Sequence, residues 1–448
     1  MVDAELEKVV ARDSQGRRST GRERQSEIFV GGLSGQEGLV PTDMQRLEAR
    51  AKEVMNREAF SYVAGGAGME RSMAANRQGF ERWGIAQRML RDVSQRDTSV
   101  ELFGHTYDSP FLLAPVGVME MAHPEADIAT ARAAASENIP MIFSSQASRP
   151  MEECASVMGT SPRWFQLYWS VSNDLVTSLI RRAEKSGCQA IVVTLDTTLL
   201  GWRPRDLDLS YLPFLRGKGI AQYTSDPVFQ RLLREKNSEE SEVDSDRKIN
   251  LSTLRVLMEL AGNYPDNFLR SLTSGEPLAA VRKFIGIYSR PSLTWDDLSF
   301  LRDLTDLPIV LKGIMHPEDA RLAVEHGMDG IVVSNHGGRQ VDGGMGSIEM
   351  LPAIADAVGG QLEILFDSGI RTGADAFKAL ALGASAVLLG RPYVYALALG
   401  GYEGVAELLR NFKADFDLTM GLSGYRNISE ITDSALIERS LVRETEKL

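Results

Sequence analysis

The chain has 448 residues with an ordinary apolar share of 43%, enough for one barrel of about 250 residues with additions or for two to three domains. Its net charge of −12 at pH 7 argues against a nucleic-acid partner, and no window of about 18 uncharged apolar residues predicts a membrane span. The chain has only two cysteines, Cys154 and Cys188, which excludes a disulfide scaffold and a cysteine-ligated metal site, so we expect no metal. Because the first residues lack the apolar core of a signal peptide, we expect a cytoplasmic protein.

Two segments precede the first apolar run of the chain. Residues 1–40 are polar, charged and glycine-bearing, so we expect a loose arm that orders only against a partner subunit. From Asp43 to Tyr62 the apolar residues recur at helical spacing, which predicts one helix. We therefore place the start of the main domain, residues 41–448, between this arm and the helix.

Eight short apolar runs follow, most of them separated by a turn and a helical stretch. They are residues 111–115, 140–144, 164–168, 190–194, 308–312, 330–334, 363–367 and 386–390. Continuous apolar runs of this length are typical of parallel strands that are covered on both faces. Eight strand–helix units predict an α/β fold, a closed (β/α)8 TIM barrel with an N-terminal arm and a long insertion after the fourth strand.

The interval between Asp196 and Pro308 is longer than one helix and two loops require. The excess runs from about residue 204 to 290 and includes the charged stretch from Arg234 to Lys248, which is typical of a solvated segment. Because the insertion begins just after the strand that precedes Asp196, we expect it to form either a lid over the strand ends or an arm that contacts another subunit. The sequence leaves both open.

Polar or small residues stand at the carboxyl ends of the runs. They are Ser144, Gln166, Tyr168, Thr194, Asp196, Lys312, Ser334, His336, Asp367, Gly390 and Arg391. In a (β/α)8 barrel this face carries the active site, so their shared position predicts a single site. The turns after the last two runs predict a phosphate site, because Gly369 and Gly390 let backbone N–H groups approach a phosphate closely. Arg371 or Arg391 would supply the counter-charge.

The most informative stretch is residues 331–342, Ile-Val-Val-Ser-Asn-His-Gly-Gly-Arg-Gln-Val-Asp. A buried strand ends here, and Gly337 and Gly338 loosen the turn that places His336 and Arg339 three residues apart. A histidine can accept a proton, and a guanidinium group can bind a carboxylate through two hydrogen bonds. Together they suit an enzyme that removes a proton or a hydride from the carbon next to a carboxylate.

The segment Ser334–Gln340 resembles the active-site signature of the FMN-dependent α-hydroxy-acid oxidases and dehydrogenases, and the resemblance extends from about Ala51 to Ser434 outside the insertion. It implies bound FMN, a small 2-hydroxy acid and O2 as reactants, and a homo-oligomer, either a tetramer or an octamer. The FMN contacts that it implies are Pro115, Val116, Gly117, Ser144, Gln166, Thr194, Lys312, Ser334, Asp367, Gly369, Arg371, Gly390 and Arg391. Lys312 would stabilise the negative charge that develops on a reduced flavin ring.

The same resemblance implies a set of substrate residues. They are Tyr62, Tyr168, Arg203, His336 and Arg339, with Asp196 behind His336. Arg203 and Arg339 would clamp the substrate carboxylate, to which Tyr62 would donate a further hydrogen bond. His336 would accept a proton, from the α-hydroxyl if a hydride moves to the flavin or from the α-carbon if a carbanion forms. Asp196 would orient His336 and favour its protonated form.

Two features favour the lactate monooxygenase branch of this family. Residues 201–206, Gly-Trp-Arg-Pro-Arg-Asp, resemble a segment that this branch also has before a long insertion, and Gly117 stands where lactate oxidases tend to carry an alanine. We therefore expect an L-lactate 2-monooxygenase, which converts lactate and O2 into acetate, CO2 and water. The alternatives are an oxidase that releases hydrogen peroxide and the keto acid, and a dehydrogenase linked to a quinone or a cytochrome. Gln146 replaces a tryptophan of glycolate oxidases, which leaves the size of the substrate side chain open.

Overall fold

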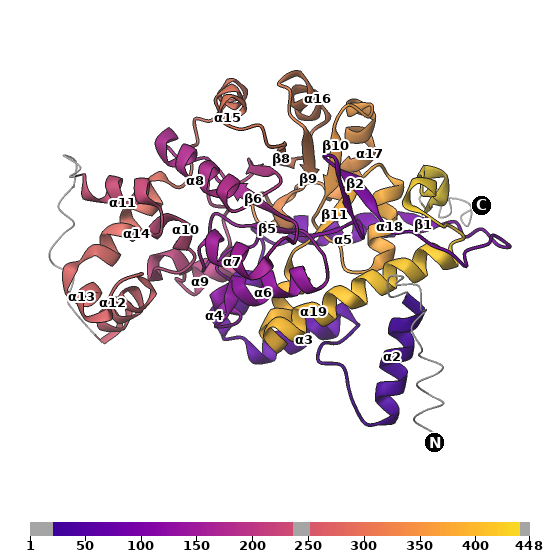
Figure 1. The fold of residues 1–448 in the computed structure, drawn as a ribbon, viewed down its shortest axis with the longest axis horizontal. Helices are drawn as coiled ribbons and strands as arrows, with labels where there is room; N and C mark the ends of the chain where they lie inside the picture. The colour runs from indigo at the N-terminus through magenta and orange to yellow at the C-terminus, as the bar shows by residue number, and fades with distance from the viewer. Residues whose placement is uncertain (1–20, 236–250, 440–448) are drawn as a thin grey trace.

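Eight parallel strands close into a barrel in the computed structural model, which describes residues 21–235 and 251–439 (Figure 1). The strands are β4 (Phe111–Leu113), β5 (Met141–Phe143), β6 (Arg163–Leu167), β7 (Ile191–Thr194), β8 (Ile309–Ile314), β9 (Gly330–Val333), β10 (Glu363–Phe366) and β11 (Ala386–Leu389). They follow one another around the barrel in chain order, and β11 pairs with β4 to close it. The expected (β/α)8 fold and all eight expected strands are therefore confirmed.

Alternate residues of each strand fill the barrel interior, as the pleat of a strand requires. The interior holds Leu112, Ile142, Trp164, Val192, Val310, Val332, Leu365 and Leu388, one from each strand. A hairpin of β2 (Val100–Leu102) and β3 (His105–Tyr107) packs on this cluster, and its Phe103 lies against Gly330 at the start of β9. The amino-terminal end of the barrel is therefore filled, and a pocket can open only at the carboxyl end.

Helices surround the barrel and cover the outer faces of its strands (Figure 1). They are α6 (Ala126–Ser136), α7 (Met151–Met158), α8 (Asn173–Lys185), α15 (Leu298–Leu304), α16 (Pro317–Glu325), α17 (Ser347–Val358), α18 (Gly373–Ala381) and α19 (Arg391–Leu422). Within the residues that the structure describes, no helix is long and apolar enough to cross a membrane. Near the end of the described chain, β12 (Leu436–Glu438) pairs antiparallel with β1 (Trp83–Ile85).

The part of the chain before the barrel is more ordered than the sequence predicts. Residues 21–33 of the expected arm form helix α2 (Gly21–Leu33), whose first N–H donates to Asp417 of α19 at 2.8 Å. The expectation of a loose arm is therefore wrong for this helix, while residues 1–20 lie outside the described residues and the boundary at residue 41 stays a prediction.

The single helix expected between Asp43 and Tyr62 is also wrong, because the structure has two helices there. They are α3 (Met44–Val54) and α4 (Arg57–Ala64). Asn56 separates them, since its side chain accepts a hydrogen bond from Ala59 N at 2.7 Å and so begins α4. The helix α5 (Arg71–Glu81) follows and packs against α17 and the turn after β9.

The insertion after β7 is largely helical. Its elements are α9 (Pro204–Asp208), η2 (Pro213–Arg216), α10 (Ala221–Thr224), α11 (Pro227–Arg234), α12 (Leu251–Asn263), α13 (Phe268–Ser274) and α14 (Glu276–Ile287). The buried Asp226 begins α11 and accepts hydrogen bonds from Ser178 at 2.8 Å and Arg182 at 3.1 Å, which ties the insertion to α8. Most of the charged stretch expected to be solvated, residues 236–248, lies outside the described residues.

Candidate active site

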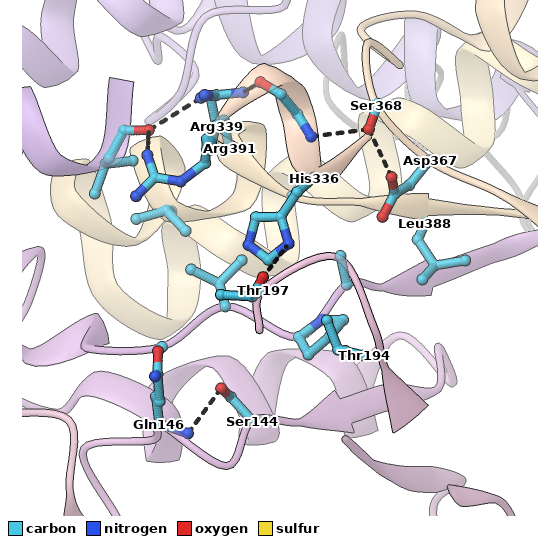
Figure 2. Close-up of a pocket in the computed structure, with 18 of the residues that line it drawn as sticks. Ser144, Gln146, Thr194, Thr197, His336, Arg339, Asp367, Ser368, Leu388 and Arg391 are labelled. Atoms are coloured by element: carbon cyan, nitrogen blue, oxygen red, sulfur yellow. Dashed lines mark hydrogen bonds between the residues drawn. The ribbon is translucent and has the colours of Figure 1, made fainter. Parts of the chain in front are cut away.

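A pocket opens at the carboxyl end of the barrel, and residues in or just after each of the eight strands line it (Figure 2). It encloses about 1200 Å³ of empty space, part of which is open to solvent. Figure 2 shows His336 projecting into the pocket from the turn after β9. The site therefore lies where the sequence predicts it, at the catalytic face of a (β/α)8 barrel.

The structure brings the residues predicted from the sequence together. Those that line the pocket are Tyr62, Pro115, Val116, Gly117, Ser144, Tyr168, Thr194, Arg203, Lys312, His336, Arg339, Asp367, Gly369, Arg371, Gly390 and Arg391. The other three stand behind the lining and contact it. Asp196 bonds His336, Ser334 accepts from Lys312, and Gln166 accepts from the backbone N–H of Ser145.

His336, which lines the pocket, forms a close pair with Asp196 behind it. The Nδ1 atom of His336 is 2.8 Å from Oδ1 of Asp196 and 3.2 Å from the hydroxyl of Thr197. Burial alone would raise the pKa of Asp196, but His336 and Lys312 lower it to about 2, so the carboxylate is ionised at neutral pH. Burial lowers the pKa of His336 although Asp196 opposes this. A neutral His336 that donates Nδ1–H to Asp196 leaves the lone pair on Nε2 free, so this atom can accept a proton.

Gln340 connects this pair to the arginine that opens the insertion. Its Nε2 donates to the backbone oxygen of Asp196 at 2.7 Å, and its Oε1 accepts from Nη2 of Arg203 at 2.7 Å. Arg203 also donates from Nε to the backbone oxygen of Arg339 at 3.1 Å. Asp196, the Arg203 guanidinium and the backbone of Arg339 are therefore held in one hydrogen-bonded unit.

Arg339 is a partly buried cation that has no ion-pair partner among the described residues. Its Nη1 donates to the backbone oxygens of Tyr62 at 2.5 Å and Gly65 at 3.0 Å, and its guanidinium lies 5.0 Å from the centre of the Tyr62 ring. Within the described residues no carboxylate forms an ion pair with Arg339 or Arg203. Burial, and then the neighbouring Arg203, lower the pKa of Arg339 to about 9. Two cations without a counter-ion predict that an anion such as a carboxylate binds between them.

The opposite part of the pocket fits FMN. Lys312 donates to Ser334 at 2.8 Å and pairs with Asp367 at 3.1 Å, and although burial lowers its pKa, Asp367 and Asp196 raise it, so the ammonium stays charged. Burial lowers the pKa of Arg371 to about 10, and no described carboxylate pairs with this side chain. Among the described residues, Thr194 Oγ1 and Gln166 Nε2 are buried without a hydrogen-bond partner. A polar ring with a phosphate tail would satisfy these groups.

The sequence missed several residues that line the pocket. They are Val63, Ala114, Thr197, Leu200, Phe214, Tyr288, Gly337, Ser368, Ile370, Leu388 and Val394. Thr197 adjoins Asp196, and a hydroxyl next to a carboxylate that is expected to orient a histidine is itself a signal. Phe214 and Tyr288 come from the insertion, and no local pattern distinguishes them from its other aromatic residues.

Gly117, which stands where lactate oxidases tend to carry an alanine, has no room for a methyl group in this structure. An ideal Cβ atom on Gly117 would lie 2.7 Å from the backbone oxygen of Gln146, which is closer than real Cβ contacts allow. The missing methyl group would therefore point at Gln146. It does not leave extra space for oxygen or product beside the cofactor, so Gly117 gives no support to a monooxygenase.

Comparisons with known proteins agree with this geometry. The family model described as FMN-dependent dehydrogenase matches residues 51–438. An FMN-dependent alpha-hydroxy acid dehydrogenase of Schizosaccharomyces pombe is 43% identical over 405 residues, which cover 89% of this chain and 92% of that protein. An L-lactate oxidase of Lysinibacillus sphaericus is 39% identical over 88% of this chain and 92% of its own length. A crystal structure of mandelate oxidase with (S)-4-hydroxymandelic acid is 36% identical, covers 89% of this chain and 98% of its own, and has a TM-score of 0.72.

Proposed function

Because the chain belongs to the family of FMN-dependent α-hydroxy-acid dehydrogenases and oxidases, we propose that it oxidises a short L-2-hydroxy acid with O2 and releases the keto acid and hydrogen peroxide. One observation carries this proposal. The free Nε2 of His336 faces a pocket that also contains Arg203 and Arg339, two cations with no described carboxylate partner. A proton acceptor beside a carboxylate clamp suits removal of a proton from the carbon or the oxygen next to a carboxylate.

The first task of the site is to fix the carboxylate of the substrate. Arg339 cannot turn freely, because Tyr62 and Gly65 accept its hydrogen bonds, and Arg203 is held by Gln340. A clamp that is already in place loses little conformational entropy when the acid binds. Tyr62, whose ring lies under the Arg339 guanidinium, borders the same part of the pocket.

The second task is proton transfer. His336 takes the proton at Nε2, and the ionised Asp196 then stabilises the imidazolium through Nδ1–H, at 2.8 Å. Bound FMN would accept the two electrons and the remaining hydrogen of the substrate. Pro115 to Gly117, Ser144, Gln166 and Thr194 would hold its ring, and Lys312 would offset negative charge near it. Whether a hydride or a carbanion route operates stays open.

Several observations favour the oxidase outcome over the monooxygenase that the sequence led us to expect. The relatives include an L-lactate oxidase and a 2-hydroxyacid oxidase of Homo sapiens that is 38% identical. The packing of Gly117 against Gln146 removes one of the two arguments for the monooxygenase. The dehydrogenase alternative stays open, because other relatives carry that name.

A second candidate, the lactate monooxygenase, draws on one observation. Phe214 and Tyr288 of the insertion line the pocket, so the insertion forms a wall that would slow the departure of a small product. Peroxide and a retained keto acid could then react to give acetate, CO2 and water. The homo-oligomeric state and the cytoplasmic location stay predictions.

Product analysis during aerobic turnover tests the proposal. FMN-loaded protein is supplied with L-lactate, and oxygen uptake, hydrogen peroxide, pyruvate and acetate are measured together. We expect peroxide and pyruvate in amounts equal to the oxygen consumed. Acetate equal to the oxygen consumed would establish the monooxygenase instead, and flavin reduction without oxygen uptake would indicate a dehydrogenase.

A further inference from the structure

The turn that presents His336 has an unfavourable backbone. His336 has a φ of 57°, and Gly337 and Gly338 follow with φ of 64° and 73°. Glycine adopts this left-handed region freely, but a residue with a side chain is strained there. Such a conformation persists only where the surrounding structure enforces it, so some contacts must hold this turn.

One holding contact comes from helix α5, far away in the sequence. Asn76 and Asn335 exchange two hydrogen bonds through their side-chain amides. Asn76 Nδ2 donates to Asn335 Oδ1 at 2.8 Å, and Asn335 Nδ2 donates to Asn76 Oδ1 at 2.7 Å. Asn76 is only 2% exposed, so water cannot replace these bonds without rearrangement.

The pair is connected directly to the strained turn. The same Asn335 Oδ1 accepts a hydrogen bond from Gly338 N at 3.0 Å, which closes the turn around His336. Asn76 Oδ1 also accepts from Ser347 N at 3.0 Å, at the first residue of α17. One buried amide therefore joins α5, the turn after β9 and the start of α17.

We propose that Asn76 is a positioning residue for His336, acting through Asn335, and this inference rests on the proposed role of His336 as the proton acceptor. Asn76 fixes the orientation of the Asn335 amide, the amide holds the turn, and the turn aims Nε2 of His336 at the substrate. Asn76 itself does not line the pocket. Its loss lowers the rate of proton removal, because a displacement of the acceptor by a fraction of an ångström reduces the population of reactive geometries.

The chain offers a matched control on the same helix. Ser72 lies one turn before Asn76, is 1% exposed, and donates to Val341 O at 2.7 Å. The same hydroxyl oxygen accepts a hydrogen bond from Gly344 N at 2.9 Å, so Ser72 also ties α5 to the segment after the turn, but it makes no bond to Asn335. The variants are Asn76→Ala, Asn76→Asp and Ser72→Ala, each measured also in combination with His336→Gln. Asn76→Asp conserves size and the hydrogen bonds that Asn76 Oδ1 accepts, but it puts a carboxylate oxygen in place of the N–H group that donates to Asn335 Oδ1.

The test measures the rate of flavin reduction by L-lactate under anaerobic conditions, together with FMN content and Tm. We expect Asn76→Ala and Asn76→Asp to slow reduction 10- to 100-fold at saturating lactate with bound FMN retained, and Ser72→Ala to change it less than threefold. In the His336→Gln background, the Asn76 substitutions should have no further effect on the rate.

Three results overturn the inference. An equal loss of rate in Ser72→Ala and Asn76→Ala would show that α5 acts only as a structural support. A full further loss in the His336→Gln background would show that Asn76 acts independently of His336. If Asn76→Ala does not fold, unchanged reduction in Asn76→Asp would exclude the positioning role. Wild-type protein that no 2-hydroxy acid reduces would instead refute the proposed function, and the inference with it.

Discussion

The pocket is built by two regions of the chain that contribute different properties. The strand ends of the barrel supply the charges and the proton acceptor, namely Lys312, His336, Arg339 and Arg371. The insertion after β7 supplies an aromatic wall through Phe214 and Tyr288. Because the first region carries the reactive groups and the second borders the space beside them, we expect substitutions in the barrel to change the reaction rate and substitutions in the insertion to change substrate preference.

The aromatic wall is supported from within the insertion. The ring of Phe284 lies 5.4 Å from Phe214, 5.1 Å from Tyr288 and 4.8 Å from Tyr223. Phe284, Tyr223 and Phe229 have no exposed surface. A wall supported by a buried aromatic cluster keeps its shape, so removing one lining ring should enlarge the pocket and not collapse it.

The largest loss of reaction rate is expected in the barrel, when the proposed proton acceptor His336 is replaced. His336→Gln keeps much of the side-chain volume and removes the base, so we expect flavin reduction by L-lactate to slow by at least about 10³-fold with FMN still bound. Stopped-flow absorbance measures the rate. His105→Gln, in the exposed hairpin at the opposite end of the barrel, is the control and should behave as wild type. If His336→Gln reduces flavin at a rate within tenfold of wild type, His336 is not the proton acceptor.

A second barrel prediction concerns the partner of this base. Asp196→Asn keeps the shape of the side chain, but the neutral amide no longer stabilises the imidazolium of His336. We therefore expect kcat to fall by about 10²- to 10³-fold. Burial already lowers the pKa of His336, and Asp196 partly opposes that shift. Activity requires neutral His336, so in wild type kcat/KM should fall only at a pH below the ordinary pKa of histidine, and the Asn variant should show this fall at a still lower pH. Titrating kcat/KM between pH 4.5 and 8 measures it, and a shift to higher pH would contradict the electrostatics described above.

The insertion should control preference more than rate. Phe214→Ala enlarges the pocket, so we expect the ratio of kcat/KM for L-mandelate to that for L-lactate to rise by about tenfold, with lactate turnover changed less than fivefold. Leu215→Ala is the matched control, because Leu215 adjoins Phe214 and is 49% exposed. If the two variants have the same ratio, the insertion does not border the substrate side chain.

The smallest effect on turnover is expected at Gly117, where both regions meet. Gly219 of the insertion also lies against the Gln146 backbone, so a methyl group on Gly117 has no free space. We expect Gly117→Ala to lower stability by about 1–3 kcal/mol, visible as a lower Tm, and to leave the ratio of peroxide to acetate unchanged. Gly262→Ala, at a helical position with nothing within 4 Å, is the control and should not lower Tm. A change of product at Gly117→Ala would restore the monooxygenase argument.

The sequence could predict the barrel side of this comparison because its signals are local. Each strand is a short apolar run, and polar residues at or just after its end gather at the carboxyl end of the barrel, so Lys312, His336 and Asp367 could be assigned to the site from strand position. Asn56 shows where local reasoning fails, because an asparagine between two helices of similar apolar spacing did not stand out as a cap.

The insertion side could not be predicted in the same way. Tyr288 reaches the pocket only because α14 packs its Phe284 between Tyr223 and Phe214, residues that lie more than 50 positions earlier in the chain. Asn76 was missed for the same reason, since its partner Asn335 is 259 residues away. Contacts of this kind depend on tertiary packing and leave no periodic pattern in the sequence.

The central claim is that the two regions together form a site in which His336 removes a proton from a bound 2-hydroxy acid. Anaerobic mixing of the FMN-loaded protein with L-lactate tests it most directly, with L-mandelate and D-lactate in parallel. We predict complete bleaching of the flavin absorbance by at least one L-acid, none by D-lactate, and bleaching at least about 10³-fold slower in His336→Gln. A flavin that none of these acids bleaches, or equal bleaching in wild type and His336→Gln, would contradict the account.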